Sequence, residues 1–324
     1  MPSFLIARET NKILAKLAAL AGVFVIVTFF LKLAPEEQTK HLQRRPALAL
    51  LERIEGHLPP DVSAEGVLVK RLRTGEVLLA KNETKIFAVA SLAKLMTAML
   101  FIERVGASEF VTVSSESQSV LESDEKRSKV KAGEALKAED LLMLLVAESD
   151  NDAAYAAAEA TVLREKPELS LVPFAGRVAE FAFLMNDKRE ALGLRNTHFM
   201  NPGGRDNLLN YSTAEELFLL ARQIYHDYPA IWNVSRIIEG DIFSKEGTSY
   251  HFENTNELLK EFPAIYGSKT GFTDQAGEAL LMLYDLAPRD PIFAVILKSQ
   301  DRFGDGRSIL RWLEESFIIT SGVR

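Results

Sequence analysis

A serine and a lysine lie three residues apart at the start of an apolar stretch, residues 90–98 (Ala-Ser-Leu-Ala-Lys-Leu-Met-Thr-Ala). On a helix, this spacing places Ser91 and Lys94 side by side on one face. Burial lowers the pKa of a lysine, and a partly neutral amine beside a hydroxyl can act as its general base. The pair could therefore make Ser91 a nucleophile. The alternative is that Ser91 caps the helix and Lys94 reaches to the surface.

The same Ser-x-x-Lys spacing also begins at Ser123 and at Ser128. Both of these copies lie in a charged, hydrophilic stretch that is typical of a solvated surface. Only Ser91 opens a segment that is apolar nearly all round, and such a helix belongs in a core. Ser91 is therefore the predicted nucleophile.

Two further short motifs offer matching polar groups. Ser149-Asp150-Asn151 separates two predicted helices and supplies a second hydroxyl and an amide, although it could simply cap the second helix. Lys269-Thr-Gly271 closes a strand-like run and supplies a second amine, although it could be only a polar strand end. The three motifs in this order form the motif set of class A β-lactamases and penicillin-binding proteins.

From about Asp61 to its C-terminus, the chain resembles the D-alanyl-D-alanine carboxypeptidases, which are low-molecular-weight penicillin-binding serine peptidases. The resemblance extends beyond the three motifs to residues 90–97, 147–154, 196–202, 254–259 and 267–277. It implies a peptidase that trims the terminal D-alanine from peptidoglycan pentapeptide stems. It also implies that β-lactam antibiotics inhibit covalently and that no cofactor is needed.

The resemblance assigns the catalytic roles. Ser91 would attack the carbonyl between the last two D-alanines, and Lys94 would take its proton. Ser149 would relay a proton to the leaving D-alanine, and Asn151 would hold the substrate amide and the Lys94 amine. Lys269 would supply positive charge that lowers neighbouring pKa values and attracts the substrate carboxylate.

The substrate-binding residues that the resemblance implies are Thr270, Gly271, Phe272 and Thr273. Thr270 and Thr273 would bind the substrate carboxylate, and Gly271 would let the substrate backbone approach the strand. The backbone N–H groups of Ser91 and Phe272 would form the oxyanion hole.

Two departures and two alternatives accompany this prediction. Thr255 stands where some relatives have an arginine that binds the carboxylate, and Asp150 stands where many have glycine. A DD-endopeptidase that cuts cross-links would use the same site. A class A-like β-lactamase would need a glutamate to activate the deacylating water, typically in Glu-x-x-Leu-Asn. The nearest text, residues 165–170, lacks the asparagine and follows the Ser-Asp-Asn motif too closely.

Composition excludes other chemistries. The 324-residue chain has a net charge of −7 and shows no Lys/Arg run, which argues against a nucleic-acid partner. It has no cysteine, so disulfides and thiolate catalysis are excluded. Its five histidines show neither His-x-x-x-His nor Glu-x-x-His spacing, so no metal site is expected.

The N-terminus carries an apolar run, residues 13–33, that is long enough to span a bilayer. We expect residues 1–34 to form an uncleaved signal anchor, which would make a single-pass protein of the cytoplasmic membrane with its catalytic domain on the extracytoplasmic side. A cleaved signal peptide is the alternative. Residues 35–60 are expected to be a linker, with a possible short helix at 45–55.

The catalytic domain is expected to span residues 61–324. Alternating patterns predict a hairpin of residues 66–72 and 76–80. Helices are predicted at residues 91–105, 139–147, 152–163, 172–192, 213–228 and 306–317. Extended segments are predicted at residues 110–114, 129–132, 243–252, 264–268, 278–286 and 292–298. This order predicts an α/β (α+β) fold of the β-lactamase/transpeptidase type, in which one antiparallel sheet is flanked by helices and a helical subdomain is inserted.

Overall fold

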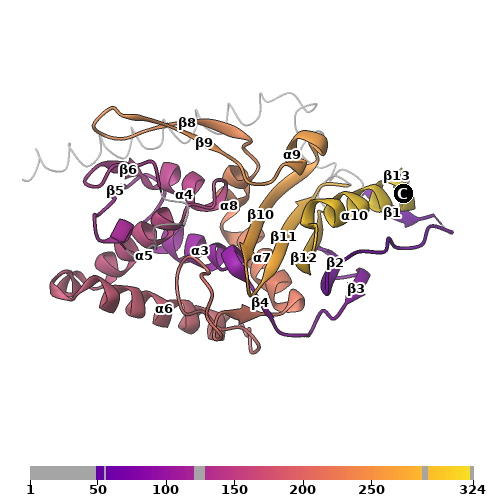
Figure 1. Cartoon of the computed structure of the whole chain (residues 1–324). Helices are drawn as coiled ribbons and strands as arrows, with labels where there is room; N and C mark the ends of the chain where they lie inside the picture. Colours follow the sequence, from indigo (N-terminus) through magenta and orange to yellow (C-terminus); the bar gives the residue numbers. More distant parts are fainter. Residues whose placement is uncertain (1–48, 55, 120–127, 287–290, 322–324) are drawn as a thin grey trace, which may run out of the picture. The chain divides into compact units, whose positions relative to one another are not determined.

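The computed structural model describes residues 49–54, 56–119, 128–286 and 291–321 (Figure 1). Residues Leu51–Ile319 form one compact unit, to which the following description applies. The predicted membrane segment, residues 13–33, and the whole predicted anchor, residues 1–34, lie outside the described residues. Among the residues that are described, no helix has both the length and the apolar character needed to cross a bilayer.

A five-stranded antiparallel sheet draws its strands from both ends of the unit (Figure 1). In spatial order the strands are β10 (Ile265–Thr273), β11 (Gly277–Tyr284), β12 (Ile292–Ser299), β2 (Gly66–Arg71) and β3 (Val77–Lys81). All four neighbouring pairs are antiparallel. The predicted hairpin and the sheet built from both ends of the domain are confirmed. Strand β10 forms one edge of this sheet.

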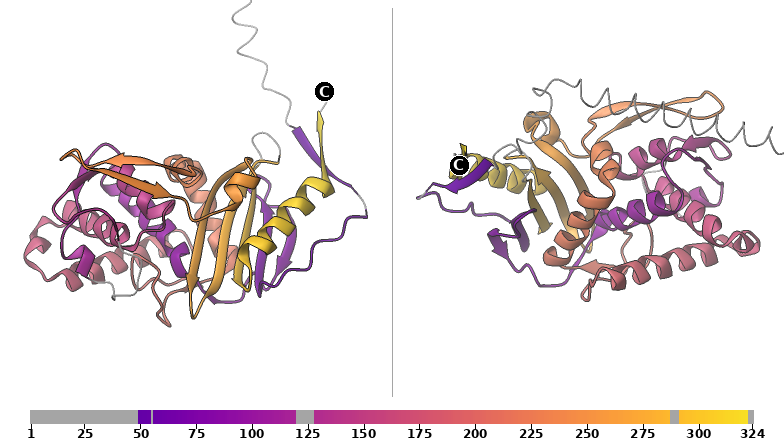
Figure 2. Two further views of the ribbon diagram at one scale, coloured as in Figure 1. Left: turned by 45° about the horizontal axis from the view of Figure 1, so that its top comes forward. Right: turned by 180° about the vertical axis from the view of Figure 1, so that it is seen from behind.

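The middle strands are unbroken apolar runs because both faces of the sheet are covered. On one face, helix α10 (Arg302–Ser316) packs so closely that a Cβ on Gly306 would lie 3.1 Å from the Leu280 side chain and 3.4 Å from the Met282 side chain. On the other face, Leu281 and Leu283 join the main hydrophobic core. Figure 2 shows α10 lying along the sheet in two further views.

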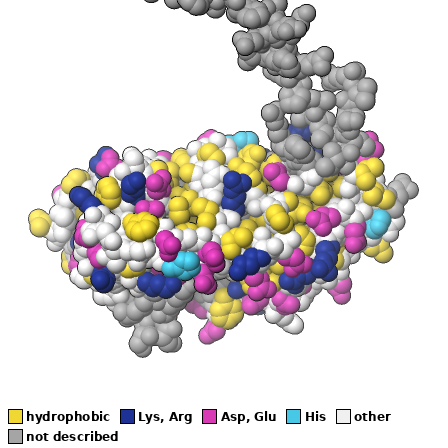
Figure 3. Space-filling model, turned by 90° about the horizontal axis from the view of Figure 1, so that it is seen from above, with side chains coloured by type: hydrophobic (Ala, Val, Ile, Leu, Met, Phe, Trp, Pro, Cys, Tyr) yellow, Lys and Arg dark blue, Asp and Glu magenta, His cyan; other side chains and the backbone are white. Residues whose placement is uncertain are grey.

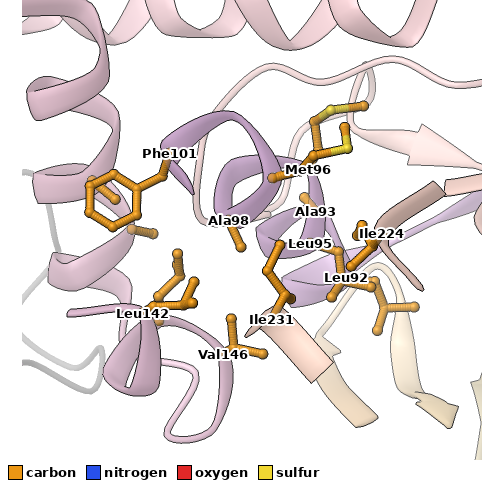
Figure 4. Close-up of a cluster of buried hydrophobic side chains, with 14 of the residues drawn as sticks. Leu92, Ala93, Leu95, Met96, Ala98, Phe101, Leu142, Val146, Ile224 and Ile231 are labelled. Carbon is orange, nitrogen blue, oxygen red and sulfur yellow. The ribbon is translucent and has the colours of Figure 1, made fainter. Parts of the chain in front are cut away.

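A helical lobe packs against the other face. Its helices are η1 (Ala90–Ala93), α3 (Lys94–Arg104), α4 (Ala138–Val146), α5 (Asn151–Glu165), α6 (Phe174–Ala191), α7 (Ala214–Asp227) and α8 (Pro229–Ser235). Residues from Lys94 to Phe101 of α3 are all buried. Figure 4 shows its side chains beside Leu142 and Val146 of α4 and Ile231 of α8. Helix α3 is thus central to the core, as its apolar sequence predicts.

Shorter elements complete the unit. The helices are η2 (Ser117–Ser119), η3 (Pro167–Leu171) and α9 (Leu258–Glu261). The two-stranded sheets pair β1 (Ala49–Arg53) with β13 (Phe317–Ser321), β4 (Phe87–Ala88) with β7 (Tyr211–Ser212), β5 (Phe110–Thr112) with β6 (Ala135–Lys137), and β8 (Glu239–Phe243) with β9 (Ser249–Glu253). On the face seen in Figure 3, acidic and basic side chains are interspersed.

Three local expectations are wrong. The helix expected at residues 45–55 is strand β1 where it is described, since β13 supplies hydrogen-bonding partners that local propensity does not include. The extended segment expected at residues 129–132 is not a strand, and the partner of β5 is β6 instead. The single strand expected at residues 243–252 is a hairpin, because Gly247 adopts φ 90° and reverses the chain.

Candidate active site

The predicted nucleophile lies in a 3-10 helix between β4 and α3, and not in the first turn of an α-helix. In a 3-10 helix residues three apart eclipse one another, which stacks Ser91 against Lys94. Lys94 Nζ donates a hydrogen bond to Ser91 Oγ over 2.9 Å. The preceding Ala90 has φ 46°, a left-handed conformation that is costly for any residue with a Cβ. Strained backbone therefore presents the serine, and the predicted pair is formed.

Lys94 has no exposed surface. Besides Ser91 Oγ, its Nζ donates to Asn151 Oδ1 over 2.7 Å and to the carbonyl oxygen of Gly203 over 2.7 Å. These three neighbours come from three separate parts of the chain and fix the position of the amine. The alternative reading of Lys94 as a lysine that reaches to the surface is wrong.

A second serine–lysine pair joins the sheet to the helical lobe. Lys269 of β10 is buried, and its Nζ donates to Ser149 Oγ over 2.7 Å and to the Thr270 carbonyl oxygen over 2.9 Å. Ser149 lies between α4 and α5 and has φ 62°, so it too is held in a left-handed conformation. The predicted Ser149, Asn151 and Lys269 thus converge with Ser91 and Lys94 at the junction of lobe and sheet edge.

Asp150 occupies the N-cap of α5, where its side chain accepts a hydrogen bond from Ala153 N over 2.9 Å. The helix-capping alternative for this motif is therefore true for Asp150, while its two neighbours serve the site. Burial raises the pKa of Asp150 to about 6, and the nearby carboxylates of Asp152 and Glu148 add to the rise. Asp150 is therefore a buried carboxyl group between the catalytic candidates Ser149 and Asn151 in the chain.

The edge strand β10 carries the predicted substrate-binding residues. A Cβ on Gly271 would lie 3.2 Å from Ser91 N, so glycine lets the strand backbone reach the nucleophile. Thr270 Oγ1 lies 2.5 Å from Thr255 Oγ1. Phe272 is 57% exposed. Thr273 Oγ1 accepts from Ala276 N over 3.1 Å, which ties Thr273 to the β10–β11 turn.

One segment of the site was not predicted from the residues, namely the loop through Gly203 and Gly204. Thr97 Oγ1 donates to the Pro202 carbonyl oxygen over 2.8 Å and holds this loop on α3. Gly204 has φ 79°, and a Cβ there would lie 1.8 Å from the Ala90 carbonyl oxygen. The signal was present in the Asn-Pro-Gly-Gly turn sequence, residues 201–204, which marks backbone that must bend sharply and approach closely.

Of the other candidate residues, those that the structure describes do not enter the site. Ser123 lies outside the described residues, and Ser128 N donates to Asp152 Oδ2 over 2.9 Å. Glu165, the nearest counterpart of a water-activating glutamate, ends α5 and forms an ion pair with Arg104. At 1.5 Å of rise per residue, it lies about 20 Å along the helix from Asn151. Glu165 therefore cannot be the water-activating glutamate that the β-lactamase alternative needs.

Comparison with known proteins agrees with this geometry. Residues 54–300 match the peptidase S11 family, described as D-alanyl-D-alanine carboxypeptidase. The chain is 30% identical to a D-alanyl-D-alanine endopeptidase of Pseudomonas aeruginosa over 79% of each chain. It is 31% identical to the D-alanyl-D-alanine carboxypeptidase DacF of Bacillus subtilis over 65% of this chain and 51% of that one, so it spans about half the length of that relative.

Solved structures show the same fold. A mutant of a Streptomyces DD-transpeptidase superposes with a TM-score of 0.69 and 26% identity over 78% of this chain and 98% of its own. This neighbour confirms the expected transpeptidase-like fold of mixed α and β structure. The family match covers more than half of the sequence and contains all three motifs. The chain therefore belongs to the D-alanyl-D-alanine carboxypeptidase family, peptidase S11.

Proposed function

We propose that this chain is a serine-type D-Ala-D-Ala carboxypeptidase that removes the terminal D-alanine from peptidoglycan pentapeptide stems through an acyl-enzyme on Ser91. One observation carries the proposal. The Lys94 amine is fully buried and lies 2.9 Å from Ser91 Oγ, within the reach that a general base needs. Burial disfavours the charged form of an amine and so favours the neutral form that accepts a proton.

The reaction would then proceed by acylation of Ser91 followed by hydrolysis of the ester. Ser91 Oγ bonds to the carbonyl carbon of the penultimate D-alanine, and its proton passes to the neutral Lys94 amine. The backbone N–H groups of Ser91 and Phe272 stabilise the oxyanion. The C–N bond breaks, and the proton that Lys94 took from Ser91 passes through Ser149 Oγ to the nitrogen of the departing D-alanine, which leaves Lys94 neutral again. A water molecule then hydrolyses the Ser91 ester and restores the free serine.

The second lysine has an electrostatic role in this proposal. Lys269 donates to Ser149 Oγ over 2.7 Å and therefore stabilises Ser149 when its hydroxyl proton moves. Its positive charge also attracts the substrate carboxylate, which Thr270 and Thr273 would bind. A β-lactam carries a carboxylate and a strained amide, so it would enter the same site, acylate Ser91 and inhibit the enzyme.

A DD-endopeptidase activity is the second candidate. Relatives from Pseudomonas aeruginosa and Escherichia coli carry the name D-alanyl-D-alanine endopeptidase. In this chain the hydroxyl of Thr255 bonds to Thr270 Oγ1 at the position where some relatives have a carboxylate-binding arginine. A site without that arginine depends less on a free substrate carboxylate, so it could also accept a cross-link whose leaving amine carries none.

One experiment separates these activities. The purified protein is incubated with a pentapeptide muropeptide and with a cross-linked muropeptide dimer, and the products are identified by mass spectrometry. Release of D-alanine from the first substrate supports the carboxypeptidase, and cleavage of the dimer supports the endopeptidase. The Ser91→Ala variant is the control and should leave both substrates intact. If the wild-type protein changes neither substrate, the proposed function is wrong.

We further propose that residues 1–34 anchor the protein in the cytoplasmic membrane with the catalytic domain on the extracytoplasmic side. The support is the apolar run of residues 13–33 and a substrate that is found outside that membrane. Full-length protein should pellet with membranes, resist high-salt extraction and need detergent for release. Protease added to spheroplasts should degrade the catalytic domain. A soluble exported form that begins near Pro35 would show a cleaved signal peptide instead.

A further inference from the structure

An arginine that none of the three motifs contains is bound to the backbone of the catalytic strand. Arg302 is the first residue of α10, and its Nη1 donates a hydrogen bond to the Gly271 carbonyl oxygen over 2.9 Å. Its own backbone N donates to Glu278 Oε2 over 2.8 Å. The helix start is fixed as well, because Asp301 caps it by accepting from Gly304 N over 2.8 Å. The backbone from which the guanidinium reaches Gly271 is therefore fixed by two hydrogen bonds.

The carbonyl that Arg302 binds belongs to the same peptide unit as the Phe272 N–H. In a trans peptide the C=O and the N–H point in opposite directions. Arg302 approaches from the side of β11, the strand that carries Glu278. Because β10 is an edge strand with β11 on one side, the Phe272 N–H points toward the open edge. The strand passes beside the nucleophile at this point, since a Cβ on Gly271 would lie 3.2 Å from Ser91 N, so the Phe272 N–H is close to the reacting serine.

We propose that Arg302 is a positioning residue that orients and polarises the Gly271–Phe272 peptide, and so strengthens the Phe272 N–H as an oxyanion donor. This inference rests on the proposed function, in which that N–H stabilises the oxyanion. A hydrogen bond from a charged group is stronger than a neutral one, and hydrogen bonds in a chain polarise one another. A donor that is already aligned needs no reorganisation when charge develops.

A role in packing alone does not explain why this position has an arginine with a buried, unsatisfied donor. Within the described part of the chain, Arg302 Nε is buried and has no hydrogen-bond partner. An unsatisfied buried donor costs free energy that an apolar side chain of similar length would avoid. The guanidinium also lies 4.8 Å from the ring centre of Phe303, so aromatic contact helps to keep it in place. The bond to Gly271 is thus the interaction that the arginine makes and that an apolar side chain of similar length would lack.

The test replaces Arg302 by methionine, which keeps much of the length but removes the donors, and by lysine, which keeps a positive donor. Arg307→Met is the matched control, because Arg307 lies on the same helix and pairs with Glu261 near the surface. For each full-length protein, stopped-flow labelling with a fluorescent penicillin separates the dissociation constant from the acylation rate constant. Infrared difference spectra with a carbonyl-labelled β-lactam then report the ester carbonyl stretch of the acyl-enzyme.

We expect Arg302→Met to lower the acylation rate constant about 10-fold, less than the loss caused by removing an oxyanion donor altogether. The dissociation constant should change less than twofold, and the carbonyl stretch should move to higher wavenumber. Arg302→Lys should recover part of the rate and part of the frequency. Arg307→Met should match the wild type in all three measurements.

Three results would overturn the inference: an unchanged acylation rate in Arg302→Met, a loss confined to the dissociation constant, or an unchanged carbonyl stretch in a slow variant. If Arg302→Met does not fold, the same measurements on Arg302→Lys decide the matter, since full activity with a shifted melting temperature alone would mean packing. Failure of the proposed function looks different, because then the wild-type protein and Arg307→Met would not be acylated at all.

Discussion

The site contains two serine–lysine pairs with similar bond lengths and different origins. Ser91 and Lys94 are three residues apart in the chain, whereas Ser149 and Lys269 are 120 residues apart. Each lysine donates to its serine hydroxyl, over 2.9 Å in the first pair and 2.7 Å in the second. Both lysines are buried. The first pair is set by the geometry of one helical turn, and the second exists only because the sheet edge meets the lobe.

The comparison shows that proximity alone does not assign a chemical role. In the proposed mechanism Lys94 must lose and regain a proton beside the nucleophile, while Lys269 must stay charged. Their surroundings differ accordingly. Lys94 is held by a hydroxyl, an amide oxygen and a backbone carbonyl from three segments, whereas Lys269 lies on the strand that would bind the substrate carboxylate. Substitutions should therefore affect the two pairs unequally.

Removal of the first hydroxyl should have the largest effect. Ser91→Ala should abolish covalent labelling by penicillin and lower D-alanine release by at least about 10⁴-fold, because no other group can form the acyl-enzyme. The melting temperature should stay near that of the wild type. Gel fluorescence with a labelled penicillin is the measurement. Labelling that persists and maps to Ser123 or Ser128 would contradict the assignment.

Exchange of each lysine for arginine should separate the two pairs. Lys94→Arg should lower the acylation rate about 10³-fold, because guanidinium stays protonated and cannot serve as a general base. Lys269→Arg should lose only about 10-fold, because its electrostatic role survives. Acylation rate constants for both variants provide the check, with circular dichroism as a control for folding. The reverse order would mean that the roles of the lysines have been exchanged.

The loop beside the first pair can be tested through its glycine. Gly204→Ala should lower the stability by about 1–3 kcal/mol through overpacking against the Ala90 carbonyl oxygen, in addition to the strain of its φ of 79°. Gly133→Ala is the matched control, because Gly133 has φ 89° but no atom within 4 Å of its Cβ position. The control should show only the left-handed strain, about 1–2 kcal/mol. Urea unfolding measures both, and equal losses would mean that the loop yields freely.

Asp150 should have the smallest effect on catalysis and a distinct effect on stability. Its pKa is about 6 in the folded protein and 3.8 for the ordinary carboxyl group, so the folded state holds its proton more tightly. Stability should therefore fall as pH rises from about 4 to about 6, by about 3 kcal/mol in total, at 1.36 kcal/mol per pKa unit.

Asp150→Asn should remove that decline, because an amide can still cap α5 but does not ionise. Denaturant unfolding at a series of pH values between 4 and 7 compares the variant with the wild type. We expect the variant to be more stable than the wild type above pH 6 and to acylate within about threefold of it. A variant curve that still falls as steeply as the wild-type curve would assign the titration to another group.

Much of the fold and of the site could be predicted from sequence patterns that are local. The apolar run after Ser91 predicts a buried helix, and i, i+3 spacing predicts contact between Ser91 and Lys94, both of which the structure contains. The order of hairpin, helices and strands predicts one antiparallel sheet built from both ends of the domain. These inferences hold because helix periodicity and strand alternation act over a few residues.

Other features were decided only by tertiary structure. The 3-10 turn at Ser91 and the left-handed backbone of Ala90 and Ser149 depend on segments that over-determine the local conformation. Strand β1 forms where a helix was expected because it pairs with β13, which is more than 260 residues away in the sequence. No local pattern encodes such a partner.

The same distinction applies to the functional groups. Resemblance to a family could assign Lys269 to the site, but only the packing of β10 against the lobe places its amine on Ser149. Two other contacts involve residues outside the three motifs. The Gly203 carbonyl binds Lys94, and Arg302 binds the Gly271 carbonyl. Backbone carbonyls look alike in any sequence, and a surface-type residue such as arginine shows its role only when the fold brings it to one particular peptide.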